Sequence, residues 1–156
     1  TAQICLNGHV ITKSAVSLPQ FKMKFCDKCG AETIMTCANC DSPIRGSYHS
    51  PGVLGIFAYP LPKYCHNCGQ AYTWTVTRIN AVQELVHELD NLKEEEKAIL
   101  EKSIDDIVQD TSRATVAAGR FKRLVAKAGK EAVDGFRSLL IDIVSETEKK
   151  SIWKDS

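Results

Sequence analysis

The sequence predicts a small α+β protein in which two tandem cysteine-rich ribbons, made of short β-hairpins and knuckles, precede an all-α bundle of three or four helices. Two observations lead to this prediction. All seven cysteines lie before residue 69 and form closely spaced pairs, while the later residues show the apolar periodicity of amphipathic helices. We therefore expect two domains, a double-ribbon domain over 1–77 and a helical bundle over 78–156 that could also serve in oligomerisation.

Eight residues form the framework of the first domain. They are seven cysteines and one histidine in four pairs, which read C-LNG-H, C-DK-C, C-AN-C and C-HN-C. The candidate metal ligands are Cys5, His9, Cys26, Cys29, Cys37, Cys40, Cys65 and Cys68. Thiolate and imidazole groups at such short spacing are typical of structural Zn²⁺, which takes four protein ligands per ion. The pattern therefore predicts two structural Zn²⁺ ions, and the ribbons are expected to be tandem zinc ribbons.

Disulfide and redox uses of the cysteines are the alternatives. Seven is an odd number, so a disulfide framework would leave one thiol unpaired, and no secretory signal is visible. Neither CDKC nor CHNC lies in the strand–helix context of thioredoxin-type redox motifs. Metal binding explains the cysteine pattern better, and a reduced, cytoplasmic location is expected with it.

The four pairs could share two ions in two ways. In a tandem grouping, the first two pairs bind one ion and the last two bind the other. In a crossed grouping of the RING type, the first pair joins the third and the second joins the fourth. Seven residues separate Cys29 from Cys37, which is room for a strand and a turn between independent sites. This spacing favours the tandem grouping.

Short strands are predicted between and after the ligand pairs from apolar alternation and from β-branched and aromatic residues. They cover 10–12, 21–25, 31–36 and 71–76. Gly30 and Gly69 directly follow the second and fourth pairs, where glycine permits a positive φ and lets backbone amides approach the thiolates.

The segment 51–62 is apolar but is interrupted by three prolines and two glycines, so neither a helix nor a central strand is expected there. One interpretation is that its side chains supply the small core that a ribbon otherwise lacks. The other is that it forms an exposed apolar surface for a protein partner.

Three histidines remain outside the predicted ligand set. His49 could replace a ligand if one site is assembled differently. His66, between the cysteines of CHNC, and His87, on a predicted helix, are expected at the surface.

Four apolar stripes at helical spacing follow the ribbons, over 79–92, 99–108, 114–128 and 133–144. Such stripes are expected to bury one another in an antiparallel bundle. Homo-oligomerisation is the alternative, because a domain of this size buries little apolar surface by itself.

Three residues indicate one helix start and one helix end. Asn91 and Glu94 resemble the N-cap and N3 residues of a helix, and Gly129 resembles a C-terminal stop. Whether 92–128 forms one helix or two is left open by the apolar pattern.

The charges are balanced, with 20 basic and 19 acidic residues. Neither half is a basic nucleic-acid binder by net charge. The exception is local, since the helix 113–130 has several cations and no acidic residue. The cations that could contact phosphates are Arg113, Arg120, Lys122, Arg123 and Lys127. Alternatively, these side chains are solvated or pair with acidic neighbours.

The knuckles CDKCG-AETI and KYCHNCGQAYTW look like those of zinc ribbons, with a cysteine pair, a glycine and an outgoing strand. The stretch ICLNGHVI…FCDKCGAETIMTCANCDSPIRG resembles an uncharacterised bacterial protein family with an N-terminal double zinc ribbon and a helical C-terminal half. The resemblance covers about residues 1–77 and extends to the helical remainder. The resemblance implies a two-zinc module in a bacterial intracellular protein, and it implies no known activity.

These observations favour a non-catalytic zinc-binding adaptor for protein–protein interaction, with the ribbons as scaffold and the helices for self-association or partner recruitment. The alternative is a nucleic-acid-binding zinc ribbon that uses the helix 113–130. An enzyme is not expected, because four protein ligands close each site and no catalytic motif is present. No membrane partner is expected, because no run of about 18 apolar residues occurs.

Overall fold

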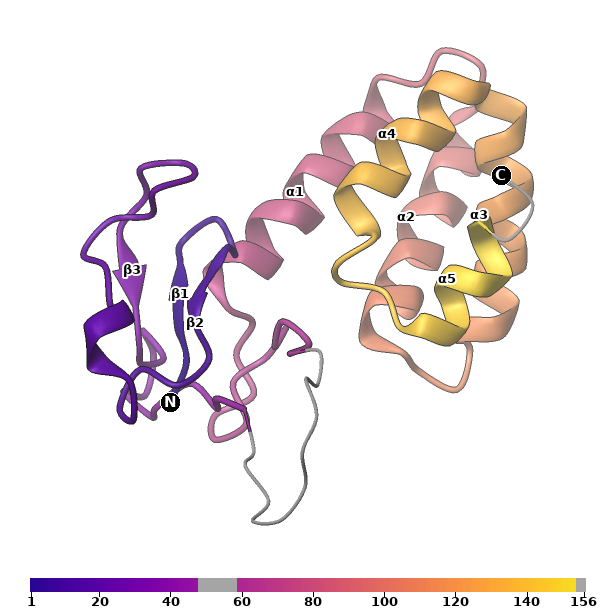
Figure 1. The fold of residues 1–156 in the computed structure, drawn as a ribbon. Coiled ribbons are helices and arrows are strands. Elements are labelled where there is room, and N and C mark those ends of the chain that lie inside the picture. Colours follow the sequence, from indigo (N-terminus) through magenta and orange to yellow (C-terminus); the bar gives the residue numbers. More distant parts are fainter. Residues whose placement is uncertain (48–58, 154–156) are drawn as a thin grey trace. The chain divides into compact units, whose positions relative to one another are not determined.

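The computed structural model describes residues 1–47 and 59–153. The chain divides into two compact units, Thr1–Thr77 and Arg78–Ser156. The first unit contains β1 (Gln3–Cys5), β2 (Val10–Thr12), the single 3₁₀ turn η1 (Pro19–Phe21) and β3 (Thr33–Ile34). Helix α1 (Thr73–His87) begins in the first unit and ends in the second, which continues with α2 (Glu94–Gln109), α3 (Ala114–Ala128), α4 (Lys130–Leu140) and α5 (Glu146–Trp153) (Figure 1). No described helix is both long and apolar enough to cross a membrane.

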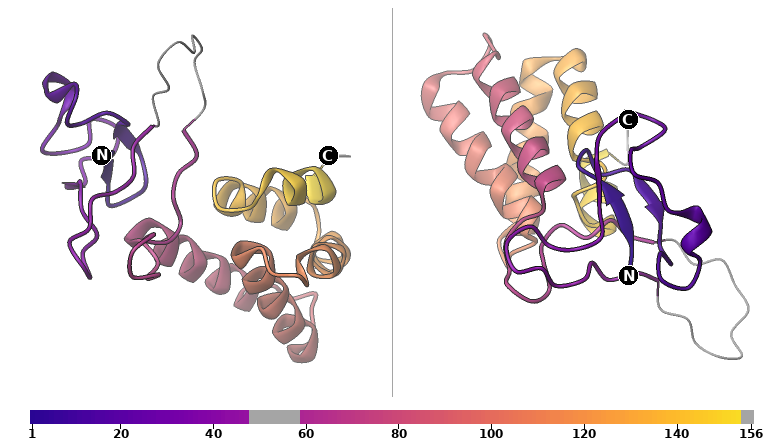
Figure 2. Two further views of the ribbon diagram at one scale, coloured as in Figure 1. Left: turned by 90° about the horizontal axis from the view of Figure 1, so that it is seen from below. Right: turned by 90° about the vertical axis from the view of Figure 1, so that its left-hand side faces the viewer.

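A three-stranded antiparallel sheet organises the first unit, with β1 between β2 and β3 (Figures 1 and 2). The first ligand pair forms the turn from β1 to β2, where the Gly8 amide donates to the Cys5 carbonyl oxygen. Ile4 lies at the centre and is fully buried. The strand predicted at 10–12 is confirmed as β2, whereas the buried central strand β1 was not predicted.

The strand predicted over 21–25 is wrong. Pro19 starts a 3₁₀ turn, and after it Met23 bonds to a side chain, while Lys24 and Phe25 make one backbone bond to Thr33 and one bridge to Glu32. The Gln3 carboxamide accepts from the Met23 amide at 3.0 Å and donates to the Met23 carbonyl oxygen at 2.8 Å. This side chain takes the place of a ladder partner, so apolar alternation is present without a strand.

The other two strand predictions hold only in part. Of 31–36, only Thr33–Ile34 forms a strand, flanked by single bridges from Glu32 and Thr36. Over 71–76, Ala71 makes one bridge and helix α1 begins at Thr73.

Buried side chains explain why a β-prone sequence is helical here. The Trp74 indole nitrogen donates to the Pro62 carbonyl oxygen at 2.8 Å, and the Thr75 hydroxyl donates to that of Lys63 at 2.9 Å. Tyr72 stacks on Trp74, with ring centroids 4.6 Å apart. These tertiary contacts override the local β propensity.

The core of the first unit is small. Apart from ligand cysteines, its buried members are Ala2, Ile4, Ile44, Tyr72 and Trp74. Tyr59 and Leu61 pack against this cluster, as the core interpretation of the segment 51–62 expected for these residues. Residues 51–58 of that segment lie outside the described residues.

Residues 92–128, for which the apolar pattern left one helix or two open, contain two helices. Helix α2 ends at Gln109, its C-cap Asp110 takes the left-handed conformation (φ 52°), and α3 begins at Ala114. The predicted N-cap at Asn91 is wrong, because the N-cap of α2 is Lys93, two residues later. There the Glu96 carboxylate accepts from the Lys93 amide at 3.1 Å.

Five helices occur in the described chain, more than the predicted three or four. Gly129 (φ 106°) separates α3 from α4, as predicted. The last apolar stripe is divided, since α4 ends at Leu140 and the buried Ile143 lies in the following turn. The additional helix α5 packs against α3 (Figure 2).

An aromatic cluster fills the centre of the helical unit. The Phe121 ring meets Phe136 edge-on at 5.5 Å and Trp153 at 6.3 Å between centroids. Three helices therefore contribute to one apolar core, and α5 is held in it by Ile152 and Trp153.

One acidic side chain is buried in this unit. Glu148 is 4% exposed, and its Oε2 atom has no hydrogen-bond partner among the described residues. Burial, with a smaller contribution from the Asp110 carboxylate, raises the pKa of Glu148. The folded state therefore holds the Glu148 proton more tightly than the unfolded state does. The stability that this proton contributes is complete below the ordinary glutamate pKa of about 4.3, and it is lost as pH rises through the folded-state pKa of Glu148.

Replacing this carboxyl group should therefore stabilise the helical unit at neutral pH. We expect Glu148→Met to raise the free energy of unfolding at pH 7 by about 1–3 kcal/mol, the usual cost of a buried unsatisfied polar group. The gain should shrink below about pH 4. Urea unfolding followed by circular dichroism at 222 nm measures it. Glu146→Met is the control, since Glu146 is exposed, and an equal gain there would contradict the prediction.

Candidate metal centres

The first cluster is assembled from the sheet and one knuckle. Cys5 ends β1, His9 precedes β2, and Cys26 and Cys29 lie on the turn after Phe25. The Sγ atoms of Cys5 and Cys29 are 3.7 Å apart. The His9 Nδ1 atom lies 3.4 Å from the Cys5 sulfur and 3.6 Å from the Cys26 sulfur.

The second cluster is assembled from two knuckles. The sulfur atoms of Cys37 and Cys68 are 3.7 Å apart, and so are those of Cys40 and Cys65. In each cluster, the four ligand atoms all lie within 4.8 Å of one another.

These separations fit a tetrahedral metal site. Bond lengths of about 2.3 Å from zinc to sulfur and about 2.0–2.1 Å to nitrogen place neighbouring ligand atoms about 3.8 Å apart for two sulfurs and about 3.6 Å for sulfur and nitrogen. The donor sets, three thiols with one imidazole and four thiols, are those of closed structural sites. The residues could therefore hold one metal ion in each cluster.

The structure brings together all eight predicted residues in the tandem grouping, and the crossed grouping does not occur. The other histidines do not join them. His66 is exposed, and the His87 Nε2 atom lies 3.0 Å from a Glu101 carboxylate oxygen on the helical unit. His49 lies outside the described residues.

Each knuckle is a tight turn that closes on its first cysteine. The Cys26 amide donates to the Ala31 carbonyl oxygen and the Gly30 amide donates to that of Cys26, both at 2.8 Å. Gly30 and Gly69 both have φ +75°, as their position after the pairs predicted. After the third pair, Asp41 takes the place of these glycines with φ +59°, and no positive φ was predicted there.

Backbone amides are directed at the sulfurs. The amides of His9, Lys28 and Asn67 donate to Cys5, Cys26 and Cys65, at 3.2, 3.4 and 3.4 Å. Such donors stabilise the negatively charged thiolate, which is the form that binds metal.

In each cluster, one asparagine side chain links the two ligand pairs. Asn7, inside the first pair, donates through Nδ2 to the Cys29 sulfur of the second pair at 3.3 Å. Asn67, inside the fourth pair, donates to the Cys40 sulfur of the third pair at 3.6 Å. Neither bond was predicted from the sequence. Both asparagines lie between the two ligands of a pair, which could have indicated the bonds. Asn39 has the same position, however, and its side chain makes no such bond among the described residues.

The electrostatics of the ligands follow from these donors. The Ala31 amide, followed by Asn7, lowers the pKa of Cys29 to about 6. The Ser42 hydroxyl and amide, followed by Asn67, lower the pKa of Cys40 to about 6. Burial has the opposite effect on Cys5 and raises its pKa. At least one thiol in each cluster is thus prepared to lose its proton before metal binds.

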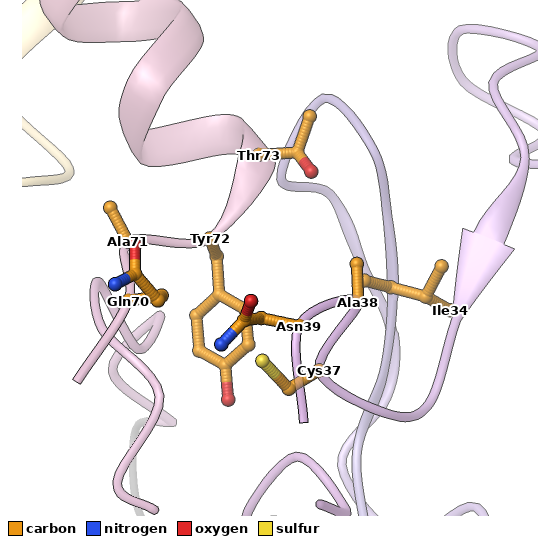
Figure 3. A pocket seen from close by; sticks show the side chains of 8 residues that line it. All are labelled: Ile34, Cys37, Ala38, Asn39, Gln70, Ala71, Tyr72 and Thr73. Atoms are coloured by element: carbon orange, nitrogen blue, oxygen red, sulfur yellow. The ribbon is translucent and has the colours of Figure 1, made fainter. Parts of the chain in front are cut away.

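A shallow hollow of about 150 Å³ lies beside the second cluster (Figure 3). The Tyr72 ring lies near Cys37 and Asn39 in its wall. Burial raises the pKa of Tyr72, and the nearby Cys65 raises it further. The remaining lining residues are Ile34, Ala38, Gln70, Ala71 and Thr73. None of these five side chains carries an acidic or basic group.

Comparison with known proteins gives one match. The sequence model of the family described as "Uncharacterized protein conserved in bacteria (DUF2321)" matches residues 1–152. No curated protein and no solved structure matches the chain.

The asparagine bonds lead to a prediction about metal affinity. Asn67→Ala should weaken metal binding at the second cluster about tenfold, because partners of metal ligands typically contribute 10–100-fold. Competition of the zinc-loaded protein against a chromophoric chelator measures the affinity. Asn39→Ala is the matched control within the same cluster and should leave it unchanged. Equal weakening by both substitutions would show that the bond to Cys40 is unimportant.

Proposed function

The chain belongs to the bacterial DUF2321 family, and from this premise we propose that it is a non-catalytic zinc-binding adaptor. In this proposal, two Zn²⁺ ions hold the ribbons as a scaffold, and the helical unit associates with itself or recruits a protein partner. This is the function that the arrangement of ligands and surfaces supports best.

The observation that carries the proposal is the closure of both clusters. Each offers four ligand atoms at tetrahedral separations. A catalytic zinc site keeps one position for water or substrate, whereas a site with four protein ligands supplies folding free energy. The structural role of the metal follows from this count.

An apolar hollow in the helical unit supports the recruiting role. An apolar hollow of about 150 Å³ is formed by α3, α4 and the end of α5, and its lining is Phe121, Lys122, Val125, Ala126, Val133, Ile152 and Trp153. It could accept one apolar side chain, in the manner of a hot-spot pocket.

Nucleic-acid binding by the cations of 113–130, most of which lie on α3, is the second candidate, supported by the exposure of Arg120 and Arg123. At least two of the five predicted cations are engaged in ion pairs. The Lys127 Nζ atom lies 2.8 Å from a Glu96 carboxylate oxygen, and the Arg113 Nε atom lies 3.9 Å from one of Asp106. These ion pairs reduce the charge available to phosphates, so this candidate ranks below the adaptor.

Loss of metal should unfold the ribbons selectively. In a Trp153→Phe background, Trp74 is the single remaining tryptophan and reports on the first unit. We expect Cys65→Ser with Cys68→Ser to shift its emission to longer wavelength and to reduce bound zinc from two ions to one, because structural zinc contributes about 10 kcal/mol or more. The circular dichroism signal at 222 nm should largely persist. An equal loss of helix would show that the two units unfold together.

The adaptor role predicts that filling the helical hollow abolishes association. Ala126 lines the hollow and its own side chain is exposed, so Ala126→Glu should fold normally. We expect it to lower partner capture or self-association at least about tenfold, the loss typical of a disrupted hot spot. Native mass spectrometry and quantitative affinity capture measure these, with the exposed Thr115→Glu as control on the same helix.

Two outcomes would count against the adaptor. One is a wild-type protein that neither self-associates nor captures a partner. The other is a gel shift with nucleic acid that falls steeply with salt and is lost in Arg120→Glu with Arg123→Glu.

A further inference from the structure

The segment 16–25 of the first unit displays a concentration of exposed apolar side chains. Every residue in it is exposed. Its large apolar members are Val16, Leu18, Phe21, Met23 and Phe25, with exposed fractions of 69, 42, 53, 40 and 54%. They make up five of the nine exposed large hydrophobic residues in the described chain. Solvated patches of this kind mark interaction sites.

The fold fixes the backbone of this segment. At its start, the Ala15 amide donates to the Thr1 carbonyl oxygen and the Leu18 amide donates to that of Ser14, both at 2.8 Å. In the middle, both backbone polar groups of Met23 bond to the Gln3 carboxamide. At its end, Phe25 bridges to Glu32 immediately before the ligand Cys26. The backbone is held on both sides, while the side chains remain in solvent.

Positive charge accompanies the apolar side chains. Lys22 and Lys24 alternate with them and are exposed, and Lys28 follows on the knuckle. No acidic residue occurs over 13–26. The Lys24 ammonium group lies 5.6 Å from the centroid of the Phe25 ring. A surface with this composition is complementary to a partner that is both anionic and apolar.

An anionic lipid bilayer has both properties. Interfacial anchors combine Phe and Leu side chains that enter the headgroup region with lysines that contact lipid phosphates. Nucleic acid would stack on the two phenylalanines but offers nothing to Val16, Leu18 and Met23. A stable protein interface uses about 20–30 residues a side, more than this segment supplies.

We propose that the segment 16–25 is an interfacial docking surface that holds the first ribbon on anionic lipid bilayers. The apolar side chains enter the headgroup region and the lysines contact lipid phosphates. This inference goes beyond the adaptor role, and it departs from the sequence-based expectation of no membrane partner. The chain lies on the bilayer in this proposal and does not span it.

Vesicle co-sedimentation of the zinc-loaded full chain tests the proposal. We expect partition onto vesicles of roughly three parts phosphatidylcholine to one part phosphatidylglycerol at low salt, and weak partition onto pure phosphatidylcholine. Lys22→Glu with Lys24→Glu should lower the partition coefficient at least about tenfold, because each lysine near an anionic surface contributes about a factor of five. Phe21→Ser with Phe25→Ser should lower it by a similar factor.

Matched controls separate this surface from general stickiness. Ile99→Ser with Val116→Ser removes two exposed apolar side chains from α2 and α3 and should leave partition unchanged. Zinc content shows that each variant keeps its ribbons. The proposal is overturned by no partition of the wild type, by equal partition onto both vesicles, or by equal loss in the control. Competition by oligothymidylate that depends on the phenylalanines would identify a nucleic-acid surface and would also overturn it.

Discussion

The structure of the first unit depends on a single electrostatic constraint, the close packing of four metal ligands in each cluster. Three pairs of sulfur atoms lie 3.7 Å apart, a separation at which two thiolates repel each other strongly. A divalent cation at the centre of each cluster would turn this repulsion into attraction, at two points along the 77 residues of the first unit. The turns, the amide donors and the linking asparagines all act by placing or stabilising these sulfurs.

The two units reach stability by different physical routes. The helical unit buries aromatic and aliphatic side chains around Phe121, Phe136 and Trp153, as expected for amphipathic helices. The first unit has few such residues, and four of its seven cysteines are themselves buried. Conditions that act on metal should therefore affect the ribbons first, whereas conditions that act on apolar burial affect the helices. This difference is the physical basis of the proposal that metal holds the ribbons as a scaffold.

The sequence predicted which candidate ligands cluster and where the helical stripes lie, because both are encoded by local spacing. The tandem grouping followed from the length of the Cys29–Cys37 connection, and Gly129 marked a helix end by its backbone freedom. The errors arose where a long-range side-chain bond decides local structure. Gln3 replaces a strand partner for Met23, and Trp74 with Thr75 fixes a helix start in a β-prone stretch. No local pattern reveals such bonds.

Metal-based stability also explains why apolar side chains can face solvent in the ribbon. In a small domain without metal, almost every large apolar residue is needed for the core. With metal bound, the clusters would supply the folding free energy, and Phe21 and Phe25 would not be required inside. A side chain that the core does not need is available to contact another surface. The backbone of the segment 16–25 is held by Gln3 at one point and by the Cys26 knuckle at another, so it loses little conformational freedom on binding.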